Sequence, residues 1–217
     1  PGVTSALAAS SYAGIPVTFR DWSAAVTFAT GHEGPEKPRM EIEPDRLARM
    51  PGTIVIYMGL ASLAGNTAAL IRGGRPADQP VAVIEAGTTP AQRVVTGTLE
   101  TIAAEVEAAG LKPPALVVVG EVAARRERLA WFERRPLFGV SVVVTRPRDR
   151  ISSLAKQIRD LGGTVIEVPV SRTEAVDPAR PEVSEALDQF EAGRYDLICF
   201  TSPTGVTFFF DLIKSRG

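Results

Sequence analysis

Cysteine and histidine are nearly absent from the sequence, which has one of each, Cys199 and His32, among its 217 residues. A single cysteine cannot form an internal disulfide, and this pair falls short of the roughly four ligands that a structural zinc ion takes. We therefore expect no metal site and no disulfide. A reducing cytoplasm is the compartment that fits this composition.

An excess of charge of one sign is also absent, because 24 Lys and Arg residues face 25 Asp and Glu residues, which gives a formal net charge of −1. Such a chain offers no electrostatic reason to bind nucleic acid or an anionic membrane. No stretch approaches the roughly 18 apolar residues of a membrane span, and the N-terminus lacks a signal-peptide pattern. We expect no nucleic-acid partner and no membrane partner.

The two commonest nucleotide-binding loops, the P-loop and Gly-x-Gly-x-x-Gly, do not occur in the sequence. What the sequence does contain is 45% hydrophobic and 23% charged residues, which is typical of a globular protein. Its length suits one large domain or two modest ones.

Six short runs of apolar residues, rich in Val and Ile, are typical of strands buried on both faces of a largely parallel sheet. They are residues 53–58, 81–86, 116–120, 140–145, 165–170 and 197–201. Apolar residues recur at helical spacing over 99–109, ahead of Gly110, and over 151–161, ahead of Gly162. Strands that alternate with helices predict an α/β fold.

Two stretches interrupt this pattern. Residues 121–150 hold eight arginines against four acidic residues, and we place a domain boundary near residue 136, between domains 1–135 and 136–217. A proline-marked stretch, 171–181, is expected to cross between subdomains. We expect loose packing and early proteolysis in 121–139 or 171–181. The start at a proline and the end after an apolar segment suggest a piece of a longer polypeptide.

The ends of the predicted strands are the natural place for a site, because ligands of open α/β sheets bind beyond the carboxyl ends of strands. At Gly59 and Gly87 the missing side chain lets a flat ligand approach the backbone, and Met58 offers a polarizable apolar surface. The alternative is that both glycines only form turns after strands, which turn statistics favour.

Three polar groups of residues also have two interpretations each. His32 suits proton transfer, but without a Ser or Cys partner it is better read as a turn residue. Arg146 and Arg148 lie beside a strand end and suit a substrate carboxylate, whereas the other arginines of the cluster suit a solvated face. Thr201 and Ser202 stand before a predicted helix, where they either bind an anion or cap the helix.

Several motifs in the first part of the chain, taken in order, resemble the tetrapyrrole methylase family, specifically the uroporphyrinogen-III C-methyltransferases. The motifs are Pro1 to Ala6, Tyr12 to Thr18, Thr30 to His32, Ile56 to Gly59, Gly87 to Arg93, Gly97 to Leu99 and Pro114 to Val122. The resemblance extends to about residue 132, and a series of motifs in the right order is more specific than any single motif.

This resemblance implies the second lobe of a methylase, in which S-adenosyl-L-methionine lies between two lobes and methylates uroporphyrinogen III to precorrin-2, on the way to siroheme or corrinoids. By motif match, the residues expected at the cofactor are Thr4, Ser5, Met58, Ala86 and Gly87. Arg20 is a candidate for a substrate carboxylate, although Phe19 replaces the histidine that usually precedes it in the family. The family implies a homodimer, and the glycine-rich first lobe is absent from this sequence.

From Phe138 onward the motifs resemble the first half of uroporphyrinogen-III synthase. They are Val142 to Pro147, Leu161 to Gly163, Val168 to Val170 and Phe200 to Val206. This resemblance implies a flavodoxin-like lobe that takes part in cyclising hydroxymethylbilane, with Thr145, Arg146, Thr201 and Ser202 at the cleft between lobes.

Because the two activities are consecutive steps of one pathway, we expect a fragment of a fused methyltransferase and synthase, inactive by itself. The alternative is a non-catalytic α/β binding or dimerisation module that keeps the fold.

Overall fold

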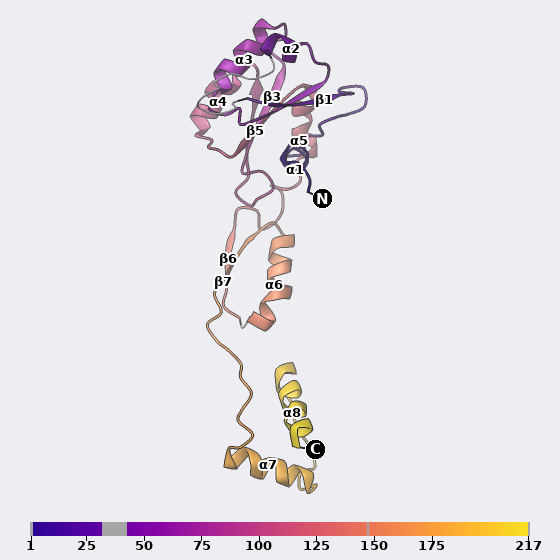
Figure 1. The fold of residues 1–217 in the computed structure, drawn as a ribbon, viewed down its shortest axis with the longest axis vertical. Coiled ribbons are helices and arrows are strands. Elements are labelled where there is room, and N and C mark those ends of the chain that lie inside the picture. Colours follow the sequence, from indigo (N-terminus) through magenta and orange to yellow (C-terminus); the bar gives the residue numbers. More distant parts are fainter. Residues whose placement is uncertain (1, 32–42, 147, 217) are drawn as a thin grey trace. The chain divides into compact units, whose positions relative to one another are not determined.

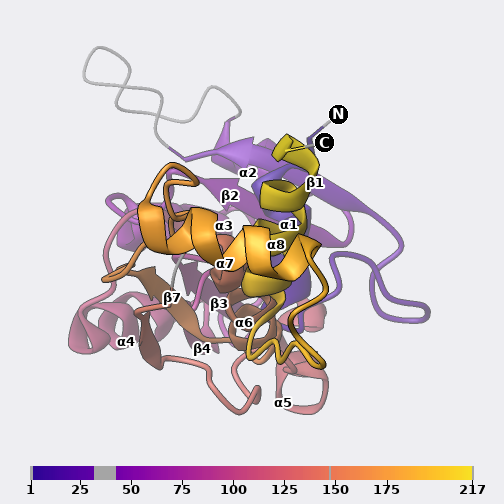
Figure 2. The same ribbon diagram turned by 90° about the horizontal axis from the view of Figure 1, so that it is seen from below.

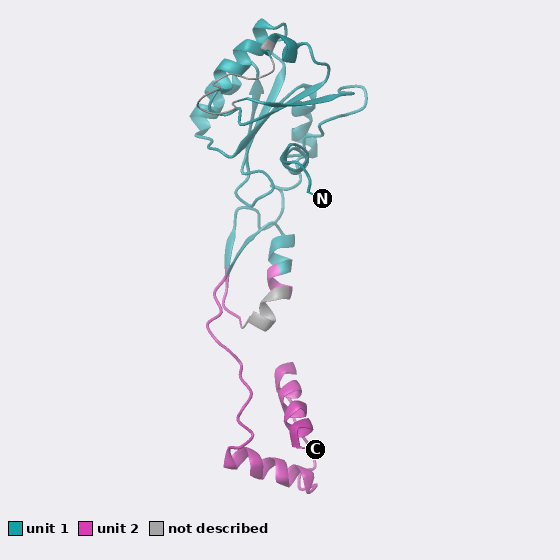
Figure 3. Cartoon of the chain, in the orientation of Figure 1, with its two compact units in different colours: residues 1–142, 156–166 teal, residues 143–155, 167–217 magenta. Residues whose placement is uncertain are grey.

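The computed structural model describes residues 2–31, 43–146 and 148–216 (Figure 1). The chain divides into two compact units, one formed by residues 1–142 and 156–166 and the other by residues 143–155 and 167–217 (Figure 3). The domain boundary near residue 136 stays a prediction.

The first unit contains a five-stranded sheet in the order β1-β2-β5-β3-β4. Its strands are β1 (Val26–Thr30), β2 (Thr53–Tyr57), β3 (Pro80–Glu85), β4 (Arg93–Thr98) and β5 (Ala115–Val119). The apolar runs correctly predict the three central strands, β2, β5 and β3. Only β1 and β2 pair in parallel, whereas the other three pairings are antiparallel, so the expectation of a largely parallel sheet is wrong.

Helices cover both faces of this sheet, which explains the apolar runs without parallel strands. Ile54, Val83 and Val117 lie in a core cluster under α2 (Pro44–Ala48), α3 (Leu63–Arg72) and α4 (Ile102–Ala109). Val55 and Val118, one residue further along their strands, lie in a second cluster with α1 (Ser5–Tyr12) and the 3₁₀ helix η1 (Glu121–Arg125). Figure 2 shows α4 and α5 (Arg126–Leu129) on either side of β3 and β4.

Arg75 is a buried cation that closes the loop between α2 and β2. Its guanidinium donates hydrogen bonds to the carbonyl oxygens of Ala48 at 2.9 Å, Met50 at 2.6 Å and Gly52 at 3.2 Å. A fourth bond, of 3.0 Å, reaches Oε1 of Gln79. Burial lowers the pKa of Arg75 from its usual value. The loop that leads into β2 is therefore held by one side chain.

The expectation of low packing density over 121–139 is wrong for three residues of this stretch, while most of its other side chains are exposed or half-buried. Val122 and Ala123 of η1 are buried, and Phe132 is 4% exposed. Phe132 contacts the rings of Tyr12 at 4.8 Å and Phe138 at 5.4 Å between centroids, so apolar and aromatic contacts fix this segment to the end of α1.

The remaining elements include a small sheet of β6 (Ser141–Val144) and β7 (Thr164–Glu167), with α6 (Arg148–Asp160) between them in sequence, as predicted. In the second unit, α7 (Pro181–Glu191) and α8 (Pro203–Arg216) are joined by ion pairs from Arg216 to Asp188 and Glu191. Gly110 ends α4 in the left-handed conformation that the sequence predicts, with φ of 63°.

The predicted strand 197–201 does not form. Leu197 is 82% exposed, and no strand of the described residues pairs with this segment. A buried strand needs neighbours that satisfy its backbone and cover its side chains. The apolar pattern of residues 197–201 alone is therefore not sufficient to form a strand.

No helix in the described part of the chain is both long and apolar enough to cross a membrane. Among the same residues, no group of three or more His, Cys, Asp or Glu side chains is arranged to hold a metal ion.

Candidate functional site

A cavity of about 620 Å³ lies in the first unit where α1 meets the ends of β2 and β3. Its lining is mostly apolar, with a few hydroxyl groups. The residues that line it are Ser5, Ala9, Tyr57, Met58, Leu60, Ala61, Ile84, Ala86, Gly87, Thr89, Pro113, Pro114, Ala115 and Leu116. Four of the five residues that motif matching assigns to the cofactor, Ser5, Met58, Ala86 and Gly87, therefore line one cavity.

The fifth residue, Thr4, is connected to this cavity through Tyr57. The hydroxyl groups of Thr4 and Tyr57 form a short hydrogen bond. The backbone N–H of Ala6 donates to the Tyr57 hydroxyl at 3.3 Å. Tyr57 thus ties the start of α1 to the end of β2. Tyr57 lies inside a family motif, but the motif does not reveal this role. Ala9 could not be predicted, because nothing in an Ala-rich helix marks the residue that faces a cavity.

The backbone is strained where β2 and β3 end. Met58, Ala86 and Thr88 have φ values of 50°, 47° and 73°, which residues with a side chain rarely adopt. Each such residue costs on the order of 1–3 kcal/mol, and such residues concentrate at functional sites. Met58 is also 61% exposed while lining the cavity. The strain and the exposed thioether together mark this as the candidate binding site.

Packing accounts for both glycines that the sequence singles out. A Cβ on Gly87 would lie 2.5 Å from the Cβ of Ala9, so its missing side chain lets α1 approach the loop after β3. A Cβ on Gly59 would lie 3.0 Å from Cγ2 of Ile56. The close approach at each position is therefore made by the protein itself. Gly87 lies in a turn, as the alternative predicts, and it also lines the cavity, whereas Gly59 lies outside a turn.

The predicted substrate residue Arg20 does not line this cavity. It is exposed in a tight turn between Phe19 and Ser23, which form a β-bridge. In the same loop Trp22 stacks under Arg125, whose guanidinium carbon lies 3.4 Å from a ring centroid. His32 lies outside the described residues.

The candidate synthase residues lie in the second unit. Thr145 and Arg146 follow β6 and are exposed, as is Thr201. Ser202 caps α8, because its Oγ accepts the N–H of Gly205 at 3.1 Å, so the capping alternative is confirmed for this residue. A shared role of these four residues at a substrate stays a prediction.

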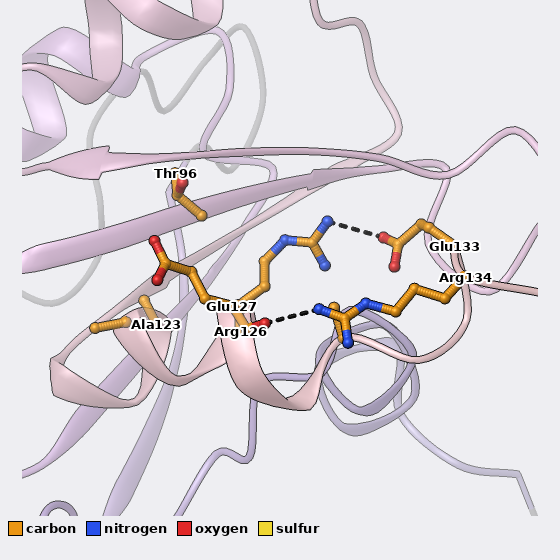
Figure 4. A pocket seen from close by; sticks show the side chains of 8 residues that line it. Thr96, Ala123, Arg126, Glu127, Glu133 and Arg134 are labelled. Carbon is orange, nitrogen blue, oxygen red and sulfur yellow. Dashed lines mark hydrogen bonds and ion pairs between the residues drawn. The ribbon is translucent and has the colours of Figure 1, made fainter.

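A second cavity of the first unit, of about 440 Å³, is lined partly by the arginine-rich segment (Figure 4). Arg126 and Glu133 form an ion pair of 3.1 Å, with each side chain 18% exposed. Arg134 donates to the backbone carbonyl of Glu127 at 2.8 Å. Arg126 is thus a packed residue, and the interpretation of this cluster as a solvated face is wrong for it.

Comparison with known proteins divides the chain in the same order as the motifs. The family of tetrapyrrole (corrin/porphyrin) methylases matches residues 1–103, and the family of uroporphyrinogen-III synthase HemD matches residues 152–217. The porphyrin biosynthesis protein HemD of Ruminiclostridium josui is 38% identical over 220 residues, which cover 100% of this chain and 42% of that protein.

An S-adenosyl-L-methionine-dependent uroporphyrinogen III methyltransferase of Methanosarcina barkeri is 50% identical over 122 residues, 56% of this chain and 48% of that protein. The solved structure of a cobalamin biosynthetic enzyme, cobalt precorrin-4 methyltransferase, is 25% identical with a TM-score of 0.51, and it covers 57% of this chain and 51% of that one. The chain spans about half the length of these curated relatives.

Proposed function

Because the chain joins a segment of the tetrapyrrole methylase family to a segment of the uroporphyrinogen-III synthase family, we propose that it is part of a bifunctional enzyme of tetrapyrrole biosynthesis. The methylase part would transfer methyl groups from S-adenosyl-L-methionine to ring carbons of uroporphyrinogen III, which leads to precorrin-2. The synthase part, a lyase, would cyclise hydroxymethylbilane to uroporphyrinogen III. The gathering of four motif-matched residues in one cavity is the observation that carries the proposal.

The cavity suits a cofactor of mixed polarity. At about 620 Å³ it is within the range of sites for small ligands, which are mostly apolar with a few fixed polar groups. Met58 and Leu60 offer apolar surface to the adenosyl group, and Ser5 offers a hydroxyl to its polar atoms. The relative from Methanosarcina barkeri carries dependence on this cofactor in its name. When bound, S-adenosyl-L-methionine supplies an electrophilic methyl group.

The role of this chain's residues is then to bind and orient, because transfer of that methyl group to an electron-rich pyrrole carbon needs alignment of the reacting atoms more than a nucleophilic side chain. The bond between Thr4 and Tyr57 fixes one wall of the cavity relative to another. Arg20, exposed near the start of the unit, is proposed to meet a substrate carboxylate, and Thr145, Arg146, Thr201 and Ser202 are proposed for the linear tetrapyrrole.

The chain alone is expected to bind the cofactor weakly and to show no turnover. The resembled methylases enclose the cofactor between two lobes, whereas Thr4, Ser5, Met58, Ala86 and Gly87 supply one side. Loss of the contacts on one side of such a ligand weakens its binding by several kcal/mol, on the order of a thousandfold or more in affinity.

The test is a titration of the 217-residue chain with S-adenosylhomocysteine, followed by nuclear magnetic resonance. We expect the resonances of Ser5, Met58 and Gly87 to shift, with an affinity weaker than micromolar. The variant Met58→Ala should bind more weakly still, because it removes the exposed thioether from the cavity. Its matched control is Met50→Ala, since Met50 is also exposed but does not line the cavity.

Equal weakening by the two methionine variants would contradict the site, as would shifts confined to residues outside the cavity. Methylation of uroporphyrinogen III by this chain would contradict the proposed inactivity.

We further propose that the enzyme is a cytoplasmic homodimer. The lone Cys199 fits a reducing compartment. Exposed apolar residues line a groove along α1, the end of α5 and the segment after it, among them Leu7, Leu129 and Trp131, and they offer surface for association. A single monomeric species by light scattering at micromolar concentration would contradict the dimer.

A further inference from the structure

Two walls of the first cavity are joined by side chains that are buried or half-buried and do not line it. One wall is α1, which supplies Ser5 and Ala9, and the other is the loop after β3, which supplies Ala86 and Gly87. They touch directly where Ala9 meets Gly87.

The link begins at Gln92, which is 3% exposed. Its side-chain oxygen accepts the backbone N–H of Thr88 at 2.9 Å, and its side-chain nitrogen donates to Oε1 of Glu133 at 2.7 Å. Thr88 directly follows Gly87 and has a strained φ of 73°. Gln92 therefore holds the loop in a conformation that it would not favour by itself.

The link continues through the ion pair of Figure 4. Nη2 of Arg126 lies 3.1 Å from Oε1 of Glu133, the same oxygen that Gln92 contacts. Nη1 of Arg126 donates to the carbonyl oxygen of Ala13, the residue that ends α1, at 2.7 Å. A continuous path thus runs from the loop after β3, through Gln92, Glu133 and Arg126, to the end of α1.

We propose that Gln92, Glu133 and Arg126 are positioning residues that hold the two walls of the cavity together, so that α5 and the segment after it help to set the shape of the binding site. Hydrogen bonds to charged groups are roughly twice as strong as those between neutral groups. The carboxylate of Glu133 can therefore hold two donors, Gln92 and Arg126, on one oxygen. Only the identity of the cavity's ligand rests on the proposed function.

A purely stabilising role explains the burial of Glu133 less well. Its second oxygen, Oε2, is buried without a hydrogen-bond partner among the described residues. Such a group destabilises the fold, and an apolar side chain of similar size would avoid that penalty. In addition, Trp131 donates to the carbonyl oxygen of Ser11 at 3.1 Å, so the segment stays attached to α1 without Glu133. Variants of Glu133 should therefore fold.

The test compares Glu133→Ala with Glu133→Gln and with Glu127→Ala. A glutamine keeps an acceptor oxygen for Gln92 and Arg126. Glu127 lines the same second cavity, but there its backbone carbonyl, not its carboxylate, receives the bond from Arg134. The first readout is amide hydrogen exchange at Thr88 in the ligand-free 217-residue chain, relative to the core amide of Val118.

Glu133→Ala should speed exchange at Thr88 by about tenfold or more, the lower limit for loss of a hydrogen bond to a charged group. Glu133→Gln and Glu127→Ala should change it by less than about threefold. Gln92→Leu removes the acceptor of the Thr88 N–H directly and should speed exchange at least as much. Unchanged exchange in Glu133→Ala, or the same increase in Glu133→Gln, would overturn the proposal. Where Glu133→Ala does not fold, Glu133→Leu, which also removes the acceptor but fills the space, gives the same decision.

The second readout is the affinity for S-adenosylhomocysteine, which should fall by about tenfold in Glu133→Ala and be restored in Glu133→Gln. Faster exchange with unchanged affinity would show that the link does not shape the binding site, and would overturn its positioning role. If the wild-type chain binds no S-adenosylhomocysteine at millimolar concentration, the proposed function fails and the exchange measurement alone decides whether the link holds the two walls.

Discussion

Replacement of Arg75 by methionine should destabilise the first unit by an amount that follows from the hydrogen bonds of its guanidinium. Methionine fills a similar length of space but donates nothing. The carbonyl of Ala48 would be left buried and unpaired, which costs about 1–3 kcal/mol. The carbonyls of Met50 and Gly52 are only partly buried and can form hydrogen bonds with water instead, so each adds less to the loss of stability.

Part of this loss of stability is offset, because the variant no longer buries a charged guanidinium. The cost of that burial is what lowers the pKa of Arg75. The net loss in the free energy of unfolding should be about 2–3 kcal/mol. Since an arginine stays charged in both states at ordinary pH, the loss should be the same at about pH 6 and about pH 9.

Urea unfolding followed by tryptophan fluorescence measures this loss, because the only two tryptophans, Trp22 and Trp131, both lie in the first unit. The midpoint should fall by about 1 M urea. Arg72→Met is the control, since Arg72 is exposed at the end of α3, and it should change stability by less than about 0.5 kcal/mol. Equal effects of the two substitutions would refute the reasoning.

Two further predictions concern packing and the backbone. Trypsin should cut first at Arg172, whose side chain is 86% exposed in a stretch without strands, and first cleavage within 121–139 would contradict this. Gly14→Ala should destabilise the fold by about 2–4 kcal/mol, because φ is +72° and a Cβ would lie 2.5 Å from the backbone just after α5. Gly110→Ala, also at positive φ but with nothing within 4 Å, should cost only about 1 kcal/mol, and equal thermal shifts would argue against the clash.

The central strands could be predicted from the sequence because burial on both faces leaves an unbroken apolar run. The direction of strand pairing could not be predicted, because β2 and β5 carry the same kind of apolar run whether they pair in parallel or antiparallel. The edge strands β1 and β4 are only half buried, and their mixed side chains hide them from a search for such runs.

The candidate site was predictable where a motif marks it and not where distant residues meet. Met58 and Gly87 follow strands, and a strand end is visible in sequence. Gln92 and Glu133 are 41 residues apart, and neither lies in a pattern that points to the other. Their pairing depends on where the segment after α5 returns to the sheet, which only the folded chain determines.

The bond between Trp131 and Ser11 also sets an order of events during synthesis. These residues are 120 positions apart, and a ribosome that adds about 5–20 residues per second needs roughly 6–24 seconds to cover that distance. For that interval the end of α1 lacks the aromatic cover that Trp131 and Phe132 later give to Tyr12. The wall of the cavity formed by α1, although translated before Trp131 and Phe132, therefore reaches its final form only after they emerge.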